Sequence, residues 1–115
     1  MDAVPAHTAD VLANVGRFIA RHRPRPEIRD QLDFRADVSG SEVILSEVRP
    51  NWKDPTIVRA FPFAKLKWVK SRRFWKLYWK RASGKWEPYV PEPSFPSIEA
   101  ALAVISADEY GCFFG

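Results

Sequence analysis

Hydrophobic residues recur at helical spacing in two parts of the chain. The first stripe, within residues 8–23, consists of Val11, Leu12, Val15, Phe18 and Ile19. The second, within residues 97–107, consists of Ile98, Leu102 and Ile105. Both spacings are those of an amphipathic helix with one buried face. We therefore expect a helix near each end of the chain, the first ended by Pro24 and the second capped by Ser94 or Ser97.

Between the two helices the pattern changes to alternating apolar and polar residues, which is the period of a β-strand. Residues 28–38 alternate with one polar face, and residues 42–49 return as a second strand after a Ser-Gly turn. Residues 50–62 contain three prolines and the isolated Trp52. This composition predicts a long loop that crosses the sheet or its edge.

Two further strands begin at Phe63 and Phe74, and their side chains select one register. The favoured pairing places Trp68 opposite Trp75, Leu66 opposite Leu77 and Ala64 opposite Trp79 on one face, with Lys67 opposite Lys76 and Lys65 opposite Tyr78 on the other. A slip by one residue would mix lysines with tryptophans on both faces, so the hydrophobic pattern specifies this register.

The pattern as a whole predicts an α+β fold. A short last strand over residues 86–90 contains Pro88, which favours an edge position. The expected order is an N-terminal helix, a five-stranded antiparallel meander and a C-terminal helix. The apolar face of the sheet needs a cover, so both helices should pack on it as a two-layer sandwich. The other face of the sheet stays open to solvent.

The composition indicates which class of protein this is and in which compartment it is expected. The 115 residues, 46% of them hydrophobic, match one globular domain, with residues 1–7 expected to be flexible. No apolar run approaches the ~20 residues that span a bilayer, so we expect no membrane partner. Cys112 is the single cysteine, which excludes an internal disulfide and favours a cytoplasmic protein.

Positive charge is concentrated in residues 65–81, which hold eight cations, five aromatic residues and no acid. The rest of the chain has ten basic and fourteen acidic residues, so the net charge of +4 arises from this segment alone. Local charge of one sign indicates an anionic partner.

The open face should present these cations together with aromatic rings. The predicted binding residues are Lys65, Lys67, Lys70, Arg72, Arg73, Phe74, Lys76, Tyr78 and Lys80, and Tyr89 is expected on the same face. Rings stack on bases and lysines neutralise phosphates, so the best interpretation is a face that binds single-stranded nucleic acid. Two alternatives remain open. The lysines form an ordinary solvated surface, or the face is a protein-interaction or homodimerisation surface for a second copy or an acidic protein.

Other chemistry is weakly indicated. His7 and His22 lack nearby partners at metal-ligand spacing and are expected on the surface, and Cys112 is expected to be a buried, inert thiol. No phosphate-binding loop, dinucleotide fingerprint or nucleophile elbow occurs, so we expect neither an enzyme nor a cofactor or metal. A second basic cluster follows the first helix at Arg17, Arg21, Arg23, Arg25 and Arg29. The dipole at the C-terminal end of the helix suffices as a structural reason for some of these arginines, with anion binding as the alternative.

Several segments together resemble a bacterial family catalogued as domain of unknown function 3024. The resemblance covers nearly the whole chain and is carried by Arg23-Pro24, Pro26, Gln31-Leu32, Glu47-Val48-Arg49-Pro50, Trp52, Pro62, Ala64-Lys65, Val69-Lys70-Ser71, Trp75-Lys76-Leu77-Tyr78-Trp79, Arg81-Ala82, Lys85-Trp86, Tyr89, Pro91 and residues 108–115. The resemblance implies a single small soluble domain without an assigned activity, cofactor or partner. Glu87 stands where the family often has a histidine, so a role of that histidine does not carry over.

The last residues of the chain are aromatic and need a place in the fold. Phe113 and Phe114 would fray from the domain unless their rings were buried. We expect both rings to pack under the sheet or against the first helix.

Overall fold

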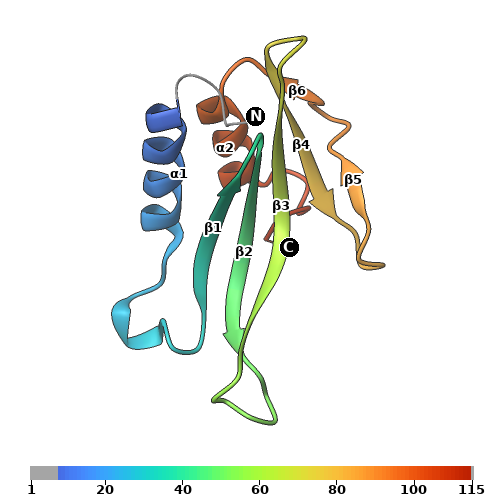
Figure 1. The fold of residues 1–115 in the computed structure, drawn as a ribbon. Coiled ribbons are helices and arrows are strands. Elements are labelled where there is room, and N and C mark those ends of the chain that lie inside the picture. The colour runs from blue at the N-terminus through green and yellow to red at the C-terminus, as the bar shows by residue number, and fades with distance from the viewer. Residues whose placement is uncertain (1–7, 115) are drawn as a thin grey trace.

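The structure, a computed structural model, describes residues 8–114, so the expected flexibility of residues 1–7 and the placement of His7 lie outside the described residues. Its elements are α1 (Thr8–His22), the 3-10 helix η1 (Pro26–Ile28), β1 (Asp33–Ser39), β2 (Glu42–Pro50), β3 (Val58–Val69), β4 (Phe74–Lys80), β5 (Trp86–Pro88), β6 (Ser94–Phe95) and α2 (Ile98–Ala107) (Figure 1). The strands form one antiparallel sheet in the order β1-β2-β3-β4-β5, and β6 also pairs with β4. The α+β fold is confirmed.

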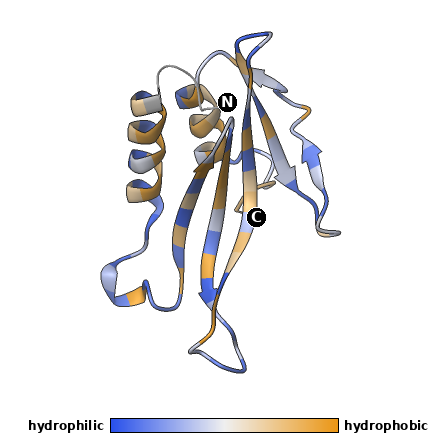
Figure 2. Cartoon of the chain, in the orientation of Figure 1, coloured by the Kyte–Doolittle hydropathy of each residue, from blue (hydrophilic) through white to orange (hydrophobic). Residues whose placement is uncertain are grey.

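Both helices lie side by side on one face of the sheet (Figure 1). They turn their hydrophobic sides toward the strands (Figure 2). The core between the layers consists of Val11, Val15, Phe18, Val43, Leu45, Phe63, Ala64, Leu66, Trp75, Leu77, Tyr89, Phe95, Ile98, Ala101, Leu102, Ile105 and Phe113. Burial of this apolar surface is the main stabilising term, as the two-layer prediction requires.

The register between β3 and β4 is the one that the hydrophobic pattern specifies. Trp68 pairs with Trp75, Leu66 with Leu77, Ala64 with Trp79, Lys67 with Lys76 and Lys65 with Tyr78. Ala64, Leu66, Trp75 and Leu77 are fully buried beneath the helices. The opposite parity of the two strands therefore forms the open face.

Two predicted boundaries were wrong. Residues 28–32 are not part of a strand: Pro26 begins η1, and Gln31 and Leu32 both donate to the carbonyl of Ile28 in a turn. The predicted loop over residues 50–62 is shorter, because β3 begins at Val58 and pairs with β2 from there onward. The prolines obscured this strand, although an antiparallel ladder tolerates proline wherever the N–H is not needed.

A β-bulge interrupts the long β2–β3 ladder. Leu45 pairs with Ala64 and Ser46 pairs with Pro62, which leaves Phe63 as the extra residue. A bulge lets consecutive residues break the strict alternation of faces. Phe63 and Ala64 are accordingly both buried in the core.

The segment after β4 also differs from a single last strand. β5 pairs with the second half of β4, and β6, which was not predicted, pairs with its first half at Trp75 and Lys76. Prolines 91 and 93 lie between the two short strands and interrupt the ladder. The helix that follows begins as expected, because the Ser97 hydroxyl accepts a hydrogen bond from Ala100 N at 3.1 Å.

The last residues fold back under the sheet. Asp108 ends α2 with a left-handed backbone (φ 44°), and its carboxylate accepts hydrogen bonds from Phe113 N at 3.0 Å and Phe114 N at 2.8 Å. The Phe113 ring lies 5.4 Å from that of Tyr89, and the Phe114 ring stacks on His22 at 5.1 Å. The predicted packing of both rings is confirmed, with Phe114 more exposed than Phe113.

Candidate nucleic-acid interface

The β3–β4 hairpin carries most of the predicted binding residues on the open face. Lys67 lies opposite Lys76, and one row further Lys65 lies opposite Tyr78. Lys67 is exposed and the other three side chains are half-buried. The two rows therefore share one face, as the sequence predicts.

A broad, open hollow of about 750 Å³ lies at the turn end of this hairpin. Its lining consists of Lys67, Trp68, Val69, Lys70, Ser71, Arg72, Phe74, Lys76 and Tyr78. Four of these side chains are cations, and three are aromatic. Phe74 and Tyr78 are half-buried, so each ring is fixed by the sheet while part of it faces the solvent.

Three lysines of the open face pack on its aromatic rings. Lys65 Nζ lies 4.7 Å from the centre of the Tyr78 ring and 5.3 Å from that of Trp86, and Lys80 Nζ also lies 5.3 Å from Trp86. Lys76 Nζ approaches the Tyr78 ring at 5.7 Å. These cation–π contacts hold the rings and the lysines in place across three strands.

Trp86 was missed as part of this face. It pairs with Lys80 in the β4–β5 ladder, which sets its parity on the open side. The Ser83-Gly84 turn could have placed Trp86 on this face, because the length of a turn fixes the register of the strands that it joins.

The hollow is electropositive because its four cations form no ion pairs with acidic side chains of the described residues. Within residues 8–114, none of Lys67, Lys70, Arg72 and Lys76 forms an ion pair. Glu42 of β2 lies directly opposite Lys67 and is the acid at the border of the face. The positive field in the hollow is thus available to an external anion.

Tyr89 was wrongly assigned to the open face. Its backbone N–H donates to Leu77 O at 2.9 Å, so it lies opposite a core residue and points inward. The side chain is only 3% exposed, and burial raises the pKa of its hydroxyl. Arg73 lies in the turn with φ 57° and is exposed, but does not line the hollow.

His22 also departs from its predicted surface position. It packs against Phe18, Phe34 and Phe114, and its Nε2 lies 2.9 Å from the Ser106 hydroxyl. Burial, followed by the charge of Arg21, lowers the pKa of the imidazole. A structural role in the packing explains these contacts.

Cys112 is half-buried, and its thiol pKa is raised first by burial and then by the charge of Asp108. A raised pKa disfavours the reactive thiolate. Residues 8–114 contain no group of three potential metal ligands, and none of their helices has the length and apolar character needed to cross a membrane.

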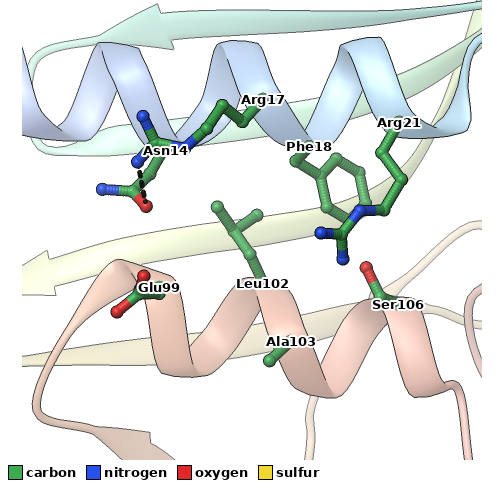
Figure 3. Close-up of a pocket in the computed structure, with 8 residues that line it drawn as sticks. All are labelled: Asn14, Arg17, Phe18, Arg21, Glu99, Leu102, Ala103 and Ser106. Carbon is green, nitrogen blue, oxygen red and sulfur yellow. Dashed lines mark hydrogen bonds between the residues drawn. The ribbon is translucent and has the colours of Figure 1, made fainter.

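The second basic cluster does not converge on one patch. Arg23 forms a bidentate pair with Asp33 at 2.8 and 2.6 Å, and Arg29 donates to the carbonyl of Pro24. Arg17 and Arg21 instead line a hollow of about 270 Å³ between α1 and α2, facing Glu99 and Ser106 across Leu102 (Figure 3). Local structural partners thus account for Arg23 and Arg29 beyond the helix end.

The chain was compared with known protein families, curated proteins and solved structures. The family described as domain of unknown function DUF3024 matches residues 4–115. Neither the curated proteins nor the solved structures include a significant match. Because the family match spans essentially the whole chain, as the resemblance implied, this protein belongs to the DUF3024 family.

Proposed function

We propose that the open face binds single-stranded nucleic acid through the hollow at the β3–β4 turn. The observation that carries the proposal is the combination of two anchored rings, Phe74 and Tyr78, with four cations that form no ion pair among the described residues. Single-stranded nucleic acids present flat bases and phosphates at close intervals, which is the complementary pattern.

The two kinds of side chain would have different tasks. Lys67, Lys70, Arg72 and Lys76 would neutralise phosphates, whereas Phe74 and Tyr78 would stack on bases, each worth about 1–3 kcal/mol. Stacking accepts any base, so binding should show little sequence preference. Release of counterions from four phosphate contacts corresponds to a slope of about −3 in log K against log salt concentration.

Two lysines of the open face do not line the hollow. Lys65 and Lys80 hold Trp86 outside the hollow and would contribute mainly long-range charge.

The free thiol of Cys112 fits a reducing compartment, so we include a cytoplasmic location in the proposal.

Charge reversal tests the proposal. The double variant Lys67→Glu/Lys76→Glu should abolish binding to fluorescent mixed-sequence DNA and RNA oligonucleotides in anisotropy titrations, and any residual binding should show a flatter salt dependence. The matched control is Lys53→Glu/Lys85→Glu, which changes the net charge equally in two exposed turns outside the hollow and should retain most of the affinity.

Two results would contradict the proposal. Salt-sensitive binding could be absent from the wild-type protein, or the two double variants could lose affinity equally, which would show that only net charge matters. Self-association of the wild type that is insensitive to salt and lost in Lys67→Glu/Lys76→Glu would instead favour a dimerisation surface on the same face.

A further inference from the structure

The long strand β3 has an unpaired edge in its first half. β3 pairs with β2 from Val58 onward, but β4 begins to pair with it only at Ala64. Within the described chain, residues 58–62 therefore have a strand neighbour on one side only. In Figure 1 this part of the β2–β3 hairpin extends beyond the helices and beyond the end of β4.

The backbone groups on this edge follow from the alternation of the ladder. Asn51 N donates to Ile57 O at 2.7 Å, which places Ile57 among the residues that bond to β2. Hydrogen-bonded and non-hydrogen-bonded pairs alternate along an antiparallel ladder, so Arg59 and Phe61 also bond to β2. The backbone N–H and C=O groups of the alternate residues point away from β2, and these residues are Val58, Ala60 and Pro62. Pro62 fits this phase because it has no N–H to donate.

Apolar side chains surround the same edge. Eight large hydrophobic residues are exposed among the described residues. Four of them lie at the turn end of the β2–β3 hairpin: Trp52, Ile57, Val58 and Phe61. Trp52 is 86% exposed, so it occupies neither a cleft nor the sheet surface. Exposed apolar residues beside unpaired backbone groups are the features of a surface that accepts another strand.

We propose that the partner is a second copy of this chain, joined edge to edge through residues 58–62 of β3. In an antiparallel pair centred on Ala60, each Ala60 exchanges two backbone hydrogen bonds with the other, and each Val58 N–H donates to the Pro62 carbonyl of the other copy. Every available N–H on the edge is then used, and the missing proline N–H is not required.

Charge and the number of backbone hydrogen bonds select this register over its two neighbours. The centred pairing places Arg59 opposite Phe61 of the other copy, which is a favourable cation–aromatic pair. A shift of one pairing step in one direction places the two Arg59 side chains opposite each other, and like charges at that position are unfavourable. A shift in the other direction pairs only Ala60 with Pro62 and halves the number of backbone hydrogen bonds.

The proposed dimer is closed and has a defined geometry. The pairing is isologous, so both copies use the same edge and no further copy can add to it. The two-fold axis of an antiparallel pair is perpendicular to the sheet, so the open faces of both copies would lie on the same side. The inference does not depend on what that face binds.

Substitutions at one position with opposite expected effects test the register. Phe61→Lys places a cation opposite Arg59 of the other copy and should shift sedimentation equilibrium toward the monomer mass. Phe61→Glu places a carboxylate there and should strengthen the dimer in a salt-sensitive manner. Both variants lose the same ring, so loss of apolar contact alone would weaken association equally in the two.

A backbone substitution tests the edge itself. Ala60→Pro removes an N–H that β2 does not use, so circular dichroism should show the native fold while dimerisation is lost. The proposal is overturned if the wild type sediments at 13.2 kDa from micromolar to millimolar concentration. It is also overturned if Ala60→Pro, natively folded, associates as the wild type does, or if the two Phe61 variants behave alike. None of these measurements involves nucleic acid, so they are independent of the test of the open face.

Discussion

Individual side chains in this protein are placed by contacts that sequence patterns do not contain. His22 was expected on the surface because no partner at metal-ligand spacing lies near it in the sequence. Its imidazole is instead half-buried against rings from α1, β1 and residue 114, and it hydrogen-bonds to Ser106 of α2. The residue joins three parts of the molecule that are far apart in sequence.

The burial of His22 predicts a pH dependence of stability. Its pKa is lowered in the folded state, so the unfolded chain binds the proton more readily. The contribution of neutral His22 should be fully present above 6.5, the ordinary pKa of an imidazole, and decline as the pH falls below that value. Urea unfolding at about pH 7.5 and about pH 5.5 should therefore show a loss of stability that His22→Gln reduces.

The acids whose pKa values are shifted titrate outside this window. Asp33 has a pKa lowered first by its hydrogen bond with Arg23, and Asp54 has one lowered by Thr56. Their contributions would be lost only in more acidic solution. An unchanged pH dependence in His22→Gln would contradict the assignment.

At the scale of elements, prediction succeeded where side-chain pattern alone decides the structure. The β3–β4 register follows from it, because a slip would bury lysines. The start of β3 was missed because Pro50 and Pro62 suggest a loop, and only the hydrogen-bond phase of the ladder shows that both are tolerated. β6 is two residues long, too short for a periodic signal.

In the candidate site, too, the side-chain pattern predicted some features and not others. The basic run identified the hairpin, and its parity identified the face on which the hollow lies. Tyr89 was misplaced and Trp86 overlooked because both depend on the pairing of β5, which the sequence constrains only through the Ser83-Gly84 turn. A hollow depends on how far each neighbouring strand extends, and no local pattern contains that information.

Helix α1 contains a position where stability should be easy to increase. Gly16 lies in its middle, is exposed, and an added Cβ would meet no atom within 4 Å. Gly16→Ala should raise the free energy of unfolding by about 0.5–1 kcal/mol, because alanine loses less backbone entropy on folding. Thermal unfolding should show an increase of a few degrees.

Gly84 provides the matched control for this prediction. An added Cβ would also meet no atom there, but the backbone has φ +87°. Gly84→Ala should therefore destabilise the protein through strain at a left-handed position. Equal effects of the two substitutions would show that the backbone conformation is not the deciding factor.

The end of the chain ties the whole molecule together. The Asp108 carboxylate accepts two backbone hydrogen bonds, from Phe113 and Phe114. Phe113 enters the core beside Tyr89, and Phe114 covers His22 and Phe63. The last residues thus join both helical and sheet layers.

Substitution of the two rings separates core packing from surface covering. Phe113 is 5% exposed, and Phe113→Ala should lower the free energy of unfolding by about 3–5 kcal/mol through loss of buried area and creation of a cavity. Phe114 is 38% exposed, so Phe114→Ala should cause a clearly smaller loss in the same urea titration. Similar losses would indicate that the tail unfolds as one unit.

The exposure of Trp52 also makes the protein its own spectroscopic reporter. Trp75 is enclosed in the core, so its fluorescence should be blue-shifted and shielded from acrylamide, whereas the indole of Trp52 should emit at long wavelength and be quenched readily. The turn between β2 and β3 contains Trp52 and leads directly into the free edge of residues 58–62. Trp68 lines the hollow and Trp86 lies on the open face, so the signal of the turn is the difference in acrylamide quenching between the wild type and Trp52→Phe. A decrease of this difference on association would report, without a label, that the neighbouring edge is occupied.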